Sequence, residues 1–127
     1  MMIAQIFGAS FGLLAVVFGA FGAHALKKKF TPEQQQSFET GVKYQMYHAI
    51  VLLIIGSMDR TQTNSYQSTI LFFIVGTILF SFSIYGLCLS AAFGNKLRFL
   101  GPVTPLGGLL LVIGWALLLY QFLATNG

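Results

Sequence analysis

Four long apolar stretches, separated by short polar segments, set the pattern of this sequence. They cover roughly residues 2–26, 41–58, 66–93 and 101–123. Each is close to or above the ~20 residues that an α-helix needs to cross a ~30 Å hydrocarbon layer at ~1.5 Å per residue. The pattern therefore predicts an all-α membrane protein, a bundle of four transmembrane helices in one domain of 127 residues.

The second stretch is the least apolar of the four, because its first two turns contain Lys43, Gln45 and His48. The segment Thr31-Pro32-Glu33-Gln34 before it is typical of a helix start, with threonine as the cap, proline in the first position and the spacing of a capping box. The residues that follow, up to Thr40, are too polar for hydrocarbon. We therefore expect a helix from Pro32, with an amphipathic interfacial extension before the second span.

Small residues recur in rows along three of the expected spans. They are Gly8, Gly12, Gly19 and Gly22 in the first span, Gly76, Ser83 and Ser90 in the third, and Gly107 and Gly114 in the fourth. Such rows let helix backbones approach closely inside a membrane. We expect them to pack helices within the chain or against a second copy. Four helices also have more of these rows than a monomer obviously needs, which favours a partner.

Composition and charge distribution agree with a membrane location. Only 8% of the residues are charged, against roughly 25% in soluble domains, and the mean hydropathy is +0.78. The net charge of +4 comes from basic residues beside apolar stretches, where lipid headgroups rather than nucleic acid explain them. Lys27–Lys29 lie in the first connection and Lys96 and Arg98 in the third, so the positive-inside rule places these connections in the cytoplasm and both termini outside.

Four short segments resemble a known family. They are GAFGAHALK at 19–27, GVKYQMYHA at 41–49, GTILFSFSIY at 76–85 and GPVTPLGG at 101–108. In this order they resemble the DUF423 family, also called UPF0382, of small four-helix bacterial membrane proteins, which is similar to the eukaryotic transmembrane protein 256. The resemblance implies a multi-pass protein of the bacterial inner membrane and implies no reaction. Phe82 stands where the family pattern has a small residue, which bears on the closeness of packing there.

The polar residues His24, Tyr44, Gln45 and His48 form the candidate site. Since the first connection joins the first two spans, we expect His24 and His48 near the same membrane face. Together they could bind a lipid headgroup, a quinone ring or a proton, or they could lock the helices together by hydrogen bonds. Two histidines without further ligands are a weak indication of haem or metal, so no cofactor is expected.

The sequence favours a non-enzymatic function. No serine lies near a histidine as a nucleophile would require, and the acids Glu33, Glu39 and Asp59 all fall in connections or at the interface, which disfavours coupled antiport. We expect an accessory or scaffolding component that packs against a larger membrane complex, itself or lipids. The alternative is binding or transport of a small solute, proton, quinone or lipid headgroup through the His24/His48 region. A water-accessible cleft at His48 would favour that alternative.

Overall fold

The computed structural model describes residues 2–58 and 66–126, and helices are the only regular secondary structure in this part of the chain. The long helices are α1 (Met2–Ala23), α2 (Pro32–Gly56) and α6 (Val103–Asn126). Between α2 and α6 lie α4 (Gln67–Thr77), the π-helical turn η2 (Ile78–Phe82), α5 (Ser83–Ala92) and the short 3₁₀ helix η3 (Arg98–Leu100). The prediction of an all-α fold is confirmed. The expected polar connection from Asp59 to Ser65 lies outside the described residues.

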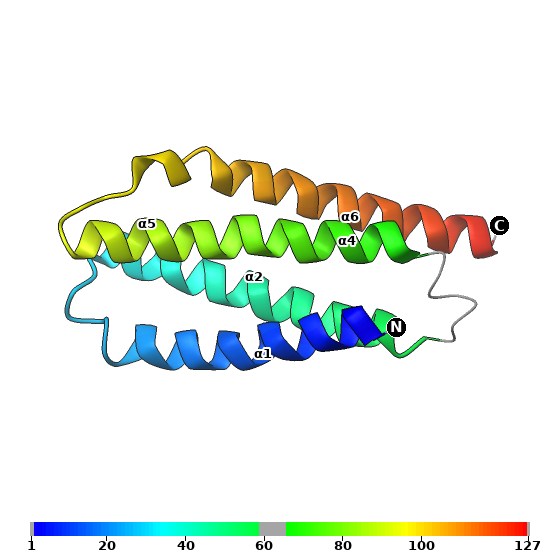
Figure 1. Ribbon diagram of the computed structural model, residues 1–127, viewed down its shortest axis with the longest axis horizontal. Helices are drawn as coiled ribbons and strands as arrows, with labels where there is room; N and C mark the ends of the chain where they lie inside the picture. Colours follow the sequence, from blue (N-terminus) through cyan, green and yellow to red (C-terminus); the bar gives the residue numbers. More distant parts are fainter. Residues whose placement is uncertain (1, 59–65, 127) are drawn as a thin grey trace.

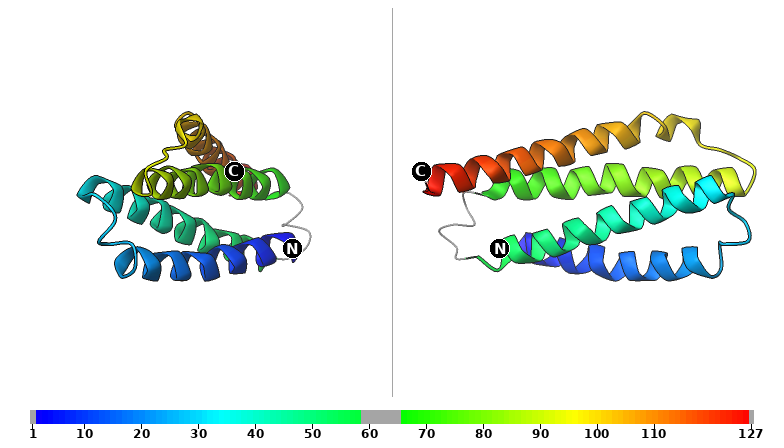
Figure 2. Two further views of the ribbon diagram at one scale, coloured as in Figure 1. Left: turned by 60° about the vertical axis from the view of Figure 1, so that its left-hand side comes forward. Right: turned by 180° about the vertical axis from the view of Figure 1, so that it is seen from behind.

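The helices form two antiparallel hairpins that lie side by side (Figures 1 and 2). In the first, α1 pairs with α2, and in the second, α6 pairs with the rod formed by α4, η2 and α5. Both chain termini lie at one end of the molecule, and the connections 24–31 and 93–102 lie at the other. There the ammonium group of Lys29 lies 4.5 Å from the centre of the Phe93 ring. The lysine-bearing connections therefore share one end, called here the lysine end.

Helix α2 begins as the sequence predicts. The Thr31 N–H donates to Oε1 of Gln34 at 3.0 Å, and the Gln34 N–H donates to Oγ1 of Thr31 at 3.1 Å, which closes the capping box. The helix then runs without a break to Gly56. Its first turns are not detached from the bundle, because Phe38 is buried against Phe30 and Tyr85. The expected polar extension is therefore the outer face of a helix that already packs at its inner face.

Glycines allow the close approach of the helices within each hairpin. A Cβ atom on Gly8 of α1 would lie 2.9 Å from the Ala49 carbonyl oxygen of α2. A Cβ atom on Gly107 of α6 would lie 2.3 Å from the Phe80 backbone nitrogen, closer than real atoms approach. Three further glycines face side chains of the neighbouring helix in the same way: Gly22 with Phe38, Gly76 with Leu111 and Gly114 with Phe73. Neighbouring helices of the same chain therefore pack against these small residues.

The remaining small residues of the predicted rows are packed less tightly. Gly12 and Gly19 face Ala49 and Val42 of α2 at ordinary contact distance, and the Ser83 hydroxyl bonds to that of Thr104 on α6. Ser90 differs, because its hydroxyl accepts from the Leu97 N–H at 3.0 Å and so holds the connection rather than another helix. It lies two residues before the end of α5, where the chain turns away.

The bulky Phe82 is accommodated between the two hairpins. Its ring makes edge contacts with Phe11 and Phe18 of α1 at centroid distances of 6.4 Å. It also lies 5.7 Å from the Tyr85 ring. An aromatic row, worth about 0.5–1.5 kcal/mol per pair beyond burial, therefore fills the space where a small residue would allow direct backbone contact.

Three helices of the described chain are long and apolar enough to cross a membrane: Met2–Ala23, Gln67–Ala92 and Arg98–Ala124. Their outer faces expose large apolar side chains such as Leu13, Leu71 and Val112, each at least 60% exposed. In a bilayer these faces would contact lipid. Helix α2 does not reach the same hydropathy, because it contains the polar residues of its first turns as well as the buried Gln45 and His48.

Candidate functional site

Gln45 of α2 lies at the centre of a hydrogen-bond chain that joins three helices. Its side chain is fully buried. The amide nitrogen donates to the Phe11 carbonyl of α1 at 2.8 Å, and the amide oxygen accepts from the Tyr85 hydroxyl of α5 at 2.6 Å. In an apolar surrounding each of these groups needs a partner. Gln45 therefore links α1, α2 and α5 inside the bundle.

His48 is used in a similar way one turn further along α2. It is buried, and its Nε2 accepts a hydrogen bond of 3.0 Å from the indole N–H of Trp115 on α6. Because indole nitrogen only donates, Nε2 carries no proton, and the proton on Nδ1 is donated to the Tyr44 carbonyl at 2.6 Å. Both ring nitrogens are engaged, so neither is free for a ligand in this arrangement.

Further polar contacts extend from α2 to the other helices. The Gln35 amide donates to the Gly22 carbonyl of α1 at 3.0 Å. The Gly41 carbonyl accepts from the buried Ser81 hydroxyl of η2 at 2.7 Å. Helix α2 thus makes side-chain hydrogen bonds to α1, to the η2–α5 segment and to α6. Its low hydropathy comes partly from these inward-pointing groups and partly from exposed polar residues in its first turns, such as Glu33, Gln36 and Glu39.

The structure brings together only part of the predicted site. Tyr44, Gln45 and His48 lie within two turns of α2, with the Tyr44 ring half-exposed and 5.0 Å from that of Phe80. His24 is exposed just beyond the end of α1. Since Gly12 faces Ala49, His48 lies at the level of Gly12, and the twelve residues to His24 correspond to about 18 Å along a helix. The expectation that the two histidines share one membrane face is therefore wrong.

Sequence reasoning missed the partners of this cluster. The bond between Trp115 and His48 could not be predicted from residues 67 positions apart. The sequence does indicate that Ser81 and Tyr85 act together, since residues four apart share a helix face. In the structure both hydroxyls bond to α2. Among the described residues, no group of three or more histidine, cysteine, aspartate or glutamate side chains is placed to hold a metal ion.

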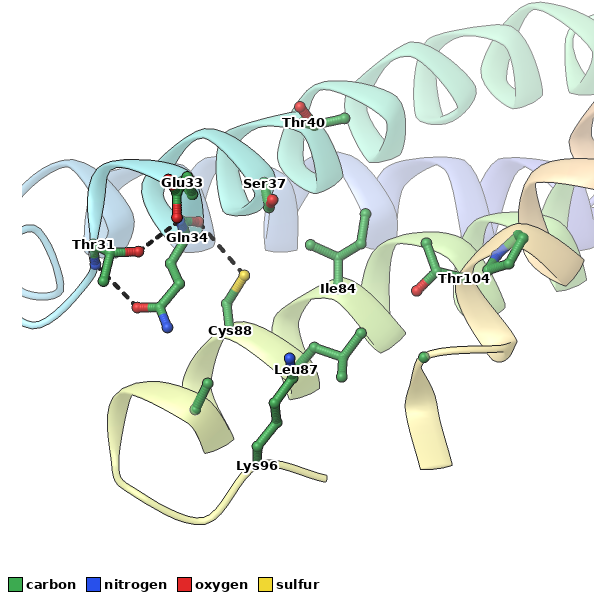
Figure 3. Close-up of a pocket in the computed structure, with 13 residues that line it drawn as sticks. Thr31, Glu33, Gln34, Ser37, Thr40, Ile84, Leu87, Cys88, Lys96 and Thr104 are labelled. Atoms are coloured by element: carbon green, nitrogen blue, oxygen red, sulfur yellow. Dashed lines mark hydrogen bonds between the residues drawn. The ribbon is translucent and has the colours of Figure 1, made fainter. Parts of the chain in front are cut away.

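A second feature, not predicted from the sequence, is a groove of about 690 Å³ at the lysine end. It lies between the first turns of α2, helix α5 and the start of α6, and we call it the polar groove (Figure 3). Its polar lining includes Glu33, Ser37, Thr40, Cys88, Lys96 and Thr104. The volume falls within the ~300–1,000 Å³ typical of small-molecule sites. Neither His24 nor His48 lines it.

The walls of the polar groove are held by contacts between helices. The Cys88 thiol lies 3.5 Å from the Gln34 carbonyl and joins α5 to α2 at the floor. The bond between Ser83 and Thr104 joins α5 to α6 on the other side. Apolar side chains, among them Ile84, Leu87 and Pro105, complete the lining. The groove is therefore a built depression with polar and apolar walls rather than a gap between loose loops.

Comparison with known proteins shows the same kind of protein in bacteria and yeast. The UPF0382 membrane protein of Staphylococcus epidermidis (strain ATCC 12228 / FDA PCI 1200) is 39% identical over 124 residues, 96% of both chains. The UPF0382 inner membrane protein YgdD of Escherichia coli K12 is 38% identical over 115 residues, 90% of this chain and 84% of its own. The UPF0382 membrane protein C1782.12c of Schizosaccharomyces pombe is 38% identical over 109 residues, 85% and 91% of the two chains.

No solved structure matches the chain. The sequence model that does match, over residues 18–108, is described as "Protein of unknown function (DUF423)". The matched segment contains the four short segments that resemble the family, the cluster of Tyr44, Gln45 and His48 on α2, and the polar groove. With the full-length relatives it leads to one conclusion: the chain is a membrane protein of the DUF423, or UPF0382, family.

Proposed function

We propose that this protein crosses the membrane four times and acts without catalysis, by binding a membrane amphiphile in the polar groove. The observation that carries the proposal is the groove itself, which lies at the lysine end and combines polar side chains, among them Glu33 and Lys96, with the apolar side chains of Ile84, Leu87 and Pro105. A lipid at a membrane surface has the same division between headgroup and chain.

The inner and outer faces of α2 support the proposal that this helix, too, crosses the membrane. Its polar side chains Gln45 and His48 are turned inward and hydrogen-bonded, whereas Tyr47, Ile50 and Ile54, each at least half exposed, point outward. The helix has 25 residues, or about 37 Å at ~1.5 Å per residue. Polar residues in membrane helices face the protein interior in this way.

The positive-inside rule supports an orientation with the lysine end in the cytoplasm. Lys27–Lys29, Lys96 and Arg98 all belong to connections at that end, and both termini lie at the other. The groove would then open at the cytoplasmic surface of the inner membrane, at the depth of the lipid headgroups.

The closed interior argues against a transport path through His48. Both its nitrogens are engaged and its ring contacts Phe73 and Trp115 at 5.2 and 5.9 Å. The polar groove does not reach His48.

The argument that the glycine rows exceed the needs of a monomer is wrong, because the rows in α1 and α6 face helices of the same chain. A binding role therefore rests on the groove and not on those rows.

Accessibility of a cysteine in the groove tests the proposal. In a Cys88→Ser background, Ser37→Cys places a thiol in the groove, and Gln36→Cys places one on the adjacent exposed position outside it. Alkylation by a water-soluble maleimide is compared in pure detergent and after adding total inner-membrane lipid. We expect lipid to slow the reaction at position 37 several-fold more than at position 36. Equal rates at both positions in both media would refute an amphiphile in the groove.

A separate labelling experiment tests the topology. In the same background, Lys28→Cys and Arg98→Cys should react with an impermeant thiol reagent from one side of sealed inner-membrane vesicles. Gln5→Cys, near the opposite end of the molecule, should react only from the other side. Reaction of positions 28 and 98 from opposite sides would contradict the four-span arrangement.

A further inference from the structure

The polar groove contains one acid and one base on facing walls. Glu33 comes from the first turn of α2, and Lys96 extends from the connection after α5 along Leu87 (Figure 3). Both residues are exposed, and within the described chain neither side chain forms an ion pair or a hydrogen bond. An occupant of the groove would therefore meet a negative and a positive group at once.

Hydroxyl groups surround the acidic wall. Ser37 and Thr40 follow Glu33 along the same face of α2 and line the groove with it. Hydroxyl and carboxylate oxygens accept hydrogen bonds from an ammonium group. Ile84, Leu87 and Pro105, from α5 and α6, add an apolar wall to the groove.

We propose that the polar groove binds the headgroup of a zwitterionic phospholipid with a primary ammonium group, such as phosphatidylethanolamine. Lys96 contacts the phosphate, Glu33 accepts from the ammonium group, and the acyl chains follow the apolar wall. This assignment rests on the proposed function, because it names the amphiphile that the same groove takes.

The lining distinguishes this headgroup from the other common ones. An anionic headgroup such as phosphatidylglycerol would satisfy Lys96 and be repelled by Glu33. A choline headgroup cannot donate hydrogen bonds, and its recognition commonly uses aromatic faces. None of the described residues that line the groove is aromatic. The combination of a carboxylate with hydroxyls fits an ammonium group that donates.

Lipid adducts of the purified full-length protein test the assignment. The protein is equilibrated in detergent with equimolar dioleoyl phosphatidylethanolamine, phosphatidylcholine and phosphatidylglycerol, and retained lipids are counted by native mass spectrometry. The variants are Glu33→Gln and Lys96→Gln. Their matched controls are Glu39→Gln and Lys28→Gln, which make the same changes at the same end but outside the groove.

For the unmodified protein we expect retained phosphatidylethanolamine to exceed phosphatidylcholine about tenfold, as one lost charge-assisted hydrogen bond would give. Glu33→Gln should abolish that preference and raise retention of phosphatidylglycerol. Lys96→Gln should lower all three lipids together, and both controls should behave as the unmodified protein. Circular dichroism confirms that each variant remains folded, which these exposed positions allow.

The lipid counts distinguish a wrong headgroup assignment from a wrong proposed function. If Lys96→Gln lowers retention while Glu33→Gln matches Glu39→Gln, the groove binds phospholipid without reading the ammonium group, and only the assignment is overturned. If neither groove variant differs from its control for any lipid, the groove does not bind phospholipid, and both are overturned.

Discussion

Replacing Gln45 by methionine removes the polar centre of the bundle while keeping a side chain of similar length. The change deletes the hydrogen bonds to the Phe11 carbonyl and from the Tyr85 hydroxyl, which join three helices. Interhelical hydrogen bonds in membrane proteins average ~0.6 kcal/mol and reach ~1.7 kcal/mol. Burying the Tyr85 hydroxyl without this acceptor adds to the cost. We expect Gln45→Met to lower the free energy of unfolding by about 2 kcal/mol.

A double-mutant cycle isolates the bond between Gln45 and Tyr85. Tyr85→Phe removes the same bond from the other side and should cost about 1 kcal/mol. Because both variants delete one shared interaction, the double variant should lose about 1 kcal/mol less than the sum of the single losses. Tyr47→Phe on the outer face of α2 is the matched control, since its ring is 54% exposed and its loss should stay within ~0.5 kcal/mol.

Unfolding can be measured by titration with sodium dodecyl sulfate in mixed micelles. Circular dichroism reports helix content, and fluorescence of Trp115, the single tryptophan, reports the contact between α6 and α2. Additive losses in the double variant, within ~0.3 kcal/mol, would show that Gln45 and Tyr85 do not cooperate. The account of α2 as the helix that locks the bundle would then be wrong.

Two further predictions concern packing and capping. Gly107→Ala should destabilise the protein by about 1–3 kcal/mol or prevent folding, because the new Cβ atom would lie 2.3 Å from the Phe80 nitrogen. The control Gly108→Ala, whose Cβ atom would lie 3.6 Å from the Phe80 ring, should be tolerated. Equal melting temperatures of the two variants would contradict this. Thr31→Ala should lose about 1 kcal/mol of capping, measured by the same unfolding titration, while Thr40→Ala, which removes only a bond to its own helix, should change little.

Features that depend on local sequence could be predicted well. The start of α2 follows from the spacing of Thr31 and Gln34, since a capping box involves residues only three apart. The shared end of the lysine-bearing connections follows from the alternation of antiparallel helices. The rows of small residues were found by helical periodicity, because a repeat of three or four residues marks one face.

Features that depend on contacts between distant segments could not be predicted. The position of His48 was judged from its distance to the first connection, but α2 begins at Pro32, so His48 lies 16 residues beyond the helix start and far from His24. The partner helix for each polar group is set by the rotation and crossing of the hairpins. The polar groove likewise depends on where η3 and α6 turn back toward α2, which no periodicity describes.

Among the long helices that the structure describes, the least apolar, α2, makes side-chain hydrogen bonds to α1, to the η2–α5 segment and to α6. In water, the burial of apolar surface would hold the bundle, but between helices already surrounded by lipid that driving force is small. Close glycine contacts hold α1 to α2 and α4 to α6, whereas Gln45, His48 and the Gly41 carbonyl bond across the boundary between hairpins. Gln45 and His48, which lower the hydropathy of α2, thus also fix the two hairpins to each other, and with them the walls of the polar groove.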